Sequence, residues 1–189
     1  MKKTISIVLI TLLAALSLHA EVKTTLYPNG KVKFVRTYEN GKLNGVAKAY
    51  YPSGKLKTYT TFLDGKVHGL TTGFYEDGAV KAEIPMYKGK LDGYQKEFYT
   101  NGQLSSVSKF QNGINVGTKK VYYPNGNLKA KLYFNEQGRL DGTAIEYYGD
   151  GNKKFSIKME NGLAKEGYLY ERNGDRRKMN PQDFVELGF

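Results

Sequence analysis

The sequence predicts an all-β protein: a single elongated antiparallel meander of about six repeated β-hairpins, each 24 residues long. The first observation is a turn motif that recurs at this interval and ends in glycine. The second is the run of about eight residues between turns, in which apolar and polar residues alternate as in a strand. One unit cannot bury its apolar residues alone, so neighbouring units must stack into a solenoid-like ribbon. The glycines that end the motif are Gly30, Gly54, Gly78, Gly102, Gly126 and Gly151.

The residues of the turns support the hairpin interpretation. In the first unit, Pro28 presets the backbone for a corner, Asn29 suits the next position, and Gly30 takes a left-handed conformation that most side chains avoid. Two further glycine columns follow in phase, the first of them in a second turn motif such as Asp64-Gly65. Each unit is therefore expected to be two antiparallel strands joined by short turns. The two columns are Gly41, Gly65, Gly89, Gly113, Gly138 and Gly162, and Gly45, Gly69, Gly93, Gly117, Gly142 and Gly167.

The ends of the chain differ from the repeats. Residues 1–20 begin with a short basic stretch, continue with an apolar run that is short for a membrane span, and end at Ala20. This order predicts a secretory signal peptide cleaved after Ala20, with an uncleaved anchor as the alternative. We therefore expect an exported protein, whether periplasmic, cell-surface or extracellular. The repeat domain is expected over residues 21–175, and residues 176–189 are expected to form a C-terminal cap or tail.

Columns of equivalent residues predict two different sheet faces. Positions two residues after the anchor glycine are apolar in five units, as in Val32 and Leu56. Positions eight residues after it are large and apolar, as in Tyr38 and Phe62, and strand parity places both columns on one core face. If the corner is a type I turn with a left-handed glycine bulge, the aromatic column that includes Tyr50 joins this face. A plain two-residue turn at Asn-Gly would exchange the two tyrosine columns.

The bulged turn would place tyrosines and lysines together on the other, solvent-exposed face. The tyrosines stand three residues before each anchor glycine, and the lysines stand three residues after it. Stacking rings that alternate with cations suit an anionic or sugar polymer, although the same pairs also protect aromatic surface on a wet sheet. This candidate ligand-binding face consists of Tyr51, Tyr75, Tyr99, Tyr123, Tyr148, Lys33, Lys57, Lys81, Lys129 and Lys154.

Composition limits both the class of partner and the scope for catalysis. The formal net charge is +11, or +9 without the two lysines of the predicted signal peptide, which favours anionic partners. His68 is the only histidine after residue 20, and it occupies a loop position held by Asn44 and Asp92 in other units. The recurrent acids are turn residues, and the sequence has no nucleotide-binding loop, zinc spacing or serine-centred elbow. We therefore expect no enzyme, no cofactor and no metal site.

The repeat resembles the bacterial variant of the MORN repeat (membrane occupation and recognition nexus). The resemblance is carried by the Tyr-Tyr-Pro-Asn-Gly motif and by the Lys-Leu-Asn-Gly loop at residues 42–45, which has close equivalents at 66–69 and 90–93. It extends from residue 26 to about residue 175. The resemblance implies a ribbon of β-hairpins used for binding, membrane association or scaffolding.

These observations lead to three functional hypotheses. The first is a non-catalytic, exported module that binds another protein or a cell-surface macromolecule as a scaffold. The alternative is a peripheral binder of anionic membrane or acidic polymer through the tyrosine and lysine face. The third is an antitoxin-like partner-binding protein, which a functioning export signal would contradict. Nucleic acid is not an expected partner.

Overall fold

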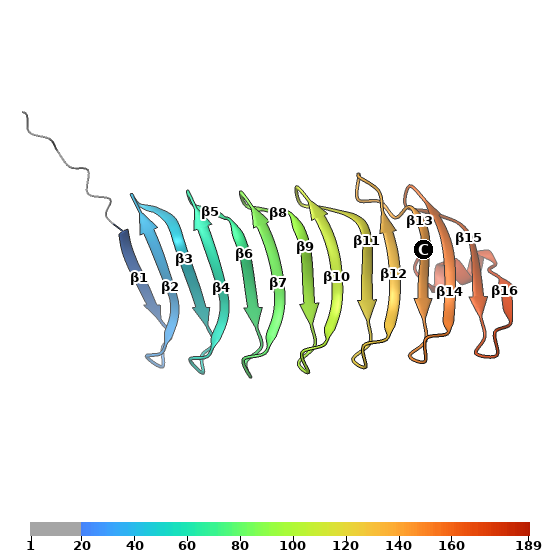
Figure 1. The fold of residues 1–189 in the computed structure, drawn as a ribbon, viewed down its shortest axis with the longest axis horizontal. Helices are drawn as coiled ribbons and strands as arrows, with labels where there is room; N and C mark the ends of the chain where they lie inside the picture. Colours follow the sequence, from blue (N-terminus) through green and yellow to red (C-terminus); the bar gives the residue numbers. More distant parts are fainter. Residues whose placement is uncertain (1–19) are drawn as a thin grey trace, which may run out of the picture.

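Residues 20–189 form a single open antiparallel sheet in the computed structural model, which describes this part of the chain (Figure 1). The predicted signal peptide lies outside the described residues, apart from Ala20. The sheet has 16 strands, and two short ones, β5 and β8, lie off a path in which consecutive strands are neighbours. The predicted meander of β-hairpins is confirmed. The strands are β1 (Ala20–Leu26), β2 (Val32–Glu39), β3 (Lys42–Tyr50), β4 (Leu56–Leu63), β5 (Lys66–Val67), β6 (Gly69–Phe74), β7 (Val80–Tyr87), β8 (Lys90–Leu91), β9 (Gly93–Phe98), β10 (Leu104–Gln111), β11 (Ile114–Tyr122), β12 (Leu128–Phe134), β13 (Gly142–Tyr147), β14 (Lys153–Glu160), β15 (Leu163–Tyr170) and β16 (Arg176–Lys178), and the helix is α1 (Pro181–Glu186).

The anchor turn of the first hairpin is a type I turn closed by a left-handed glycine. The amide of Gly30 donates to the carbonyl of Tyr27 at 2.9 Å, and the amide of Tyr27 donates to the carbonyl of Lys31 at 2.8 Å. Gly30 has a φ of +81°, a conformation that is costly for residues with a Cβ. The same two bonds recur in each of the seven hairpins. The chain therefore adopts the bulged alternative, and Tyr50 pairs with Leu56 as the bulged turn predicts.

A second bulge, which recurs through the first six hairpins, changes the face that the following residues occupy. In the first hairpin Leu26 pairs with Val32. The next paired residue is Phe34, which leaves Lys33 as an extra residue. An extra residue reverses the side to which later residues point, so the expectation that the columns of Val32 and Tyr38 share one face is wrong. The extra residues are Lys33, Lys57, Lys81, Ser105, Lys129 and Lys154.

The two sides of the sheet are named here the helix face and the opposite face. The helix face carries the column of Tyr38, the predicted tyrosine and lysine columns, and the side chains on which α1 packs. The opposite face carries the column of Val32 and the aromatic partners of that column, such as Tyr50. The expectation that the tyrosines and lysines lie away from the column of Tyr38 is therefore also wrong.

The C-terminal end of the helix face holds the buried core. There Ala144 is 1% exposed and Ile157 is fully buried beneath α1. Gly167 leaves room for this packing, because a Cβ at that position would lie 2.4 Å from the sulfur of Met179 and 3.1 Å from Phe184. The cluster consists of Ala144, Phe155, Ile157, Met159 and Met179, with Phe184 and Leu187 among the side chains packed against it.

Helix α1 is short, and no helix among residues 20–189 is long and apolar enough to cross a membrane. Its first turn is capped reciprocally, because Asn180 accepts from the amide of Asp183 at 3.1 Å and the Asp183 carboxylate accepts from the amide of Asn180 at 2.7 Å. Arg177 on β16 donates two further bonds of 2.7 Å to the same carboxylate. Arg177 and the Asn180 amide together lower the pKa of Asp183 to about 2. These contacts fix α1 against the sheet.

Candidate functional site

The predicted tyrosine column forms a ladder of hydrogen bonds between successive hairpins. The hydroxyl of Tyr51 donates to the carbonyl of Phe74 in the next hairpin at 2.7 Å, and Tyr75 donates to Phe98 at the same distance. The rings are half-buried, and the bond lengthens to 3.4 Å only at Tyr148. The tyrosine hydroxyls are therefore engaged within the sheet. The other bonds of the ladder run from Tyr27 to Tyr50, from Tyr99 to Tyr122 and from Tyr123 to Tyr147.

Four lysines of the predicted face cover these tyrosine rings. The ammonium of Lys57 lies 5.4 Å from the centre of the Tyr51 ring, a distance typical of cation–π contacts. The four lysine side chains are exposed, so the ammonium groups remain accessible on the helix face. The structure thus brings the predicted tyrosines and lysines together. The other three distances are 5.5 Å for Lys33 and Tyr27, 5.5 Å for Lys81 and Tyr75, and 5.6 Å for Lys129 and Tyr123.

The arrangement is broken at two places along the column. Ser105 replaces the lysine that would cover Tyr99. Lys154 instead forms an ion pair of 3.0 Å with Glu146, and hydrogen bonding with this carboxylate raises the pKa of Lys154. Tyr148 is covered by Arg172, whose guanidinium carbon lies 5.0 Å from the ring centre. The cationic series is therefore continuous only over the first three hairpins.

His68 belongs to a loop between strands, as its sequence position predicts. Its amide donates to the carbonyl of Thr61 at 2.9 Å, and its ring lies 5.2 Å from that of Tyr87. Tyr87 is 51% exposed. These contacts assign His68 a place in the packing of the loop.

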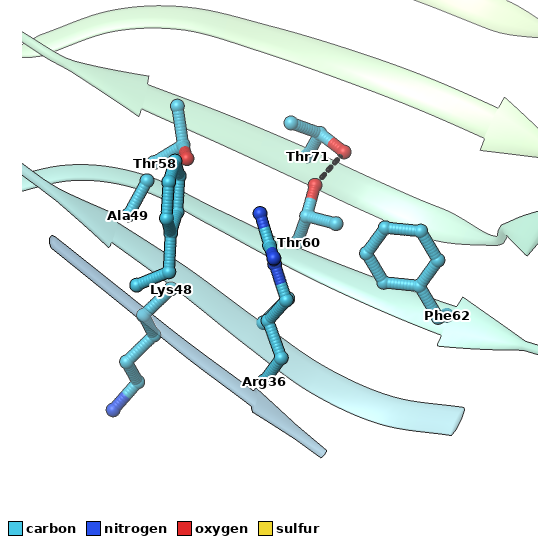
Figure 2. Close-up of a pocket in the computed structure, with 9 residues that line it drawn as sticks. Arg36, Lys48, Ala49, Thr58, Thr60, Phe62 and Thr71 are labelled. Atoms are coloured by element: carbon cyan, nitrogen blue, oxygen red, sulfur yellow. Dashed lines mark hydrogen bonds between the residues drawn. The ribbon is translucent and has the colours of Figure 1, made fainter. Parts of the chain in front are cut away.

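A shallow groove lies on the helix face near the N-terminal end of the sheet and has a volume of about 190 Å³. Figure 2 shows Arg36, Thr60 and Phe62 projecting to one side of the strands, whereas Lys48 points away. The guanidinium carbon of Arg36 lies 4.2 Å from the centre of the Phe34 ring, so the cation is stacked on the floor of the groove. The rest of the lining includes Ala47, Ala49, Thr58 and Thr71.

The groove occupies the same place in its hairpins as the buried core does at the other end of the sheet. Arg36, Thr60 and Ile157 each stand six residues after the anchor glycine of their unit. Ile157 is fully buried beneath α1, whereas Arg36 and Thr60 are only half-buried, and within residues 20–189 no helix covers them. The helix face is therefore closed at its C-terminal end and open at its N-terminal end.

The groove was not predicted from the sequence, because its position depends on the bulges at Lys33 and Lys57. A bulge of this kind does not change the 24-residue spacing, so the glycine columns do not reveal it. The signal that was present is the pair Ala47 and Ala49. These small residues lie directly opposite Arg36 and Phe34 and leave space beside the larger side chains.

A sequence profile of the family described as "MORN repeat variant" matches five successive segments of the chain, which together make up more than half of its length. Each matched segment contains one anchor turn, so the repeat of the family corresponds to the hairpin described above. A search of curated proteins finds no match for the chain. The matched segments are residues 22–40, 43–64, 67–88, 91–112 and 115–136.

Proposed function

The chain belongs to the MORN repeat variant family, and from this premise we propose that it is an exported, non-catalytic scaffold that binds another protein through the open part of its helix face. MORN repeats are in general non-catalytic modules that bind proteins or membranes. Beyond this family property, we propose that the open part of the helix face makes the contact, that the partner is a protein, and that the chain acts outside the cytosol.

The observation that carries the proposal is the difference between the two ends of the helix face. At the C-terminal end, α1 covers the apolar floor and buries Ile157 completely. At the N-terminal end, the equivalent floor of Phe34 and Phe62 is left as a groove. Apolar surface removed from water contributes about 25 cal/mol per Å², so a segment that covers this floor is favoured.

The contacts of α1 indicate what kind of segment suits the groove. Phe184 on α1 and Leu187, which caps the helix three residues later, pack on the core of the sheet, and Asp183 on α1 pairs with Arg177. The groove offers an apolar floor together with Arg36, which forms no ion pair among residues 20–189. The partner segment we propose is therefore amphipathic, with apolar residues on one side and a carboxylate placed to reach Arg36.

Export is supported by the sequence of residues 1–20, whose basic start and uncharged apolar run are typical of a signal peptide. Fractionation of the tagged full-length protein tests this part of the proposal. We expect the mature chain outside the cytosol. Recovery of the uncleaved chain in the cytosol would instead favour an antitoxin-like role inside the cell.

Photo-crosslinking tests the docking surface. A crosslinking residue placed at Phe62 on the helix face should capture one discrete protein in cells that express the chain. The same residue placed at Tyr59, which pairs with Lys48 on the opposite face, is the matched position and should not capture it. Equal capture from both positions, or capture of no protein from Phe62, would contradict the proposal.

The captured protein must then bind the purified chain directly. Arg36→Glu should weaken this binding at least tenfold, because it reverses the charge that faces the carboxylate of the partner. Lys48→Glu makes the same change of charge on the other side of the sheet and should leave the affinity within about twofold. If the two variants weaken binding equally, net charge and not the groove determines the affinity.

A second candidate function is binding to anionic membranes. It is favoured by the exposed ammonium groups of Lys33, Lys57, Lys81 and Lys129, which follow one edge of the helix face. This function predicts that the chain floats with anionic vesicles and is released by salt. Changing the four lysines together to Gln should abolish flotation, and unchanged flotation would exclude this surface.

A further inference from the structure

Three lysines lie close together on the opposite face, in the middle of the sheet. Lys120 on β11 and Lys131 on β12 are direct cross-strand partners. The Cβ atoms of such partners are about 5 Å apart. Lys109 on β10 stands two residues from Val107, which is itself the cross-strand partner of Lys120. The register of the sheet thus gathers three cations from three adjacent strands.

These lysines lack the acidic partners that other basic residues of the sheet have. Lys96 on β9 pairs with Glu83 at 3.1 Å, and Lys178 on β16 pairs with Glu166 at the same distance. Seven ion pairs form among residues 20–189, and none of them includes Lys109, Lys120 or Lys131. Like charges directly opposite each other destabilise a sheet, so an anion placed between them would relieve the repulsion.

The same lysines line a hollow of about 540 Å³ in the opposite face. Tyr94 and Tyr122 form aromatic walls, and Thr118, which carries a hydroxyl group, also lines the hollow. Gly117 also belongs to the lining, and a Cβ there would meet no atom within 4 Å, so the space above it is open. The hollow is large enough for a small molecule, and the three lysines on its border can donate hydrogen bonds from positively charged ammonium groups.

We propose that Lys109, Lys120 and Lys131 form a binding site for the phosphate group of a small ligand. A phosphate group carries a charge of about −1.5 to −2 and three acceptor oxygens, so it is able to contact three ammonium groups at once. Lysine binds phosphate as a point charge and does not require the planar geometry of arginine. A carboxylate has only two oxygens and one charge, and it would leave one of the three lysines unsatisfied. The aromatic walls suit an organic part attached to the phosphate.

Calorimetric titration of the whole mature chain with inorganic pyrophosphate at low ionic strength tests the site. We expect saturable binding that weakens as salt is added. Changing Lys109, Lys120 and Lys131 together to Gln should lower the affinity at least tenfold. The matched control changes the exposed Lys42, Lys66 and Lys90 to Gln, which removes the same charge away from the hollow and should alter the affinity by less than about twofold.

Thermal unfolding keeps the test independent of folding defects. Removing repulsion between Lys120 and Lys131 should leave the Tm of the triple variant equal to or above that of the wild type, and pyrophosphate should raise only the wild-type Tm. Vesicles of phosphatidylglycerol distinguish the source of the phosphate: binding that the triple variant loses identifies a lipid headgroup, and binding of pyrophosphate alone identifies a free phosphate compound. Absence of binding to either probe, or equal loss in both triple variants, would overturn the proposal.

Discussion

The tyrosine ladder provides a direct way to separate structural from ligand-binding roles on the helix face. Tyr51, Tyr75 and Tyr99 each donate a hydroxyl hydrogen bond of 2.7 Å to a backbone carbonyl of the next hairpin. Changing all three to Phe removes these bonds and keeps the three rings, with Lys57 still over position 51 and Lys81 still over position 75. We therefore expect a loss of stability that spreads across three contacts between hairpins.

The magnitude follows from the bonds that are lost. A hydrogen bond of this kind contributes about 1 kcal/mol net to the free energy of unfolding. The three bonds have no shared partner, so their effects should add to about 3 kcal/mol. With a urea dependence of about 2 kcal/mol per molar, the unfolding midpoint should fall by about 1.5 M.

Urea unfolding followed by circular dichroism measures this change. Tyr87→Phe is the matched control, because Tyr87 is 51% exposed and its hydroxyl makes no hydrogen bond within residues 20–189. It should change the free energy of unfolding by less than about 0.5 kcal/mol. A triple variant as stable as the wild type would refute the structural role that we assign to these hydroxyls.

Three further predictions concern the C-terminal cap. Ile157→Ala should lower the free energy of unfolding by about 2–5 kcal/mol in a denaturant titration. Ile84 stands at the same position of a hairpin that no helix of residues 20–189 covers, so Ile84→Ala should lower this free energy clearly less. Equal losses would show that α1 does not bury Ile157. Gly167→Ala should displace α1 and lower the free energy of unfolding by about 1–3 kcal/mol, because the new Cβ would occupy the space of the Met179 sulfur. Faster proteolysis near α1 would reveal the displacement. The pKa of Asp183 is about 2 in the folded chain, below its unfolded value of about 3.9, so the stabilisation is present above about pH 4 and is lost as the pH falls toward 2. Melting curves of the wild type and of Asp183→Asn should therefore converge at low pH, and a constant difference would contradict this.

The repeat and its turns could be predicted from the sequence because they depend on local backbone conformation. Gly30 takes a left-handed conformation that few other residues accept, so glycine must recur wherever this turn recurs. The hairpin length and the pairing of Tyr50 with Leu56 follow from the same turn. The choice between the two turn types needed the structure, because Asn-Gly suits both of them.

The arrangement of the two faces could not be predicted, because it depends on a bulge without a sequence signature of its own. Lys33 is a normal strand residue in the sequence, but it is the extra residue that moves Phe34 and Arg36 onto the helix face. The faces predicted from strand parity were therefore correct for residues before Lys33 and were the wrong ones for residues after it. The pairing of Lys120 with Lys131 was missed for a related reason, since the extra residue Lys129 sets the register of their hairpin.

Cysteine labelling tests most directly the claim that the open part of the helix face is occupied by a partner. The chain has no cysteine, so single substitutions report one position each. Thr71 lines the groove, whereas the adjacent Thr72 pairs with Glu83 on the opposite face. We predict that Thr71→Cys reacts with a maleimide in the purified chain but is protected in the cell envelope, while Thr72→Cys reacts equally in both. Equal labelling of the Thr71→Cys variant in the two settings would contradict the account.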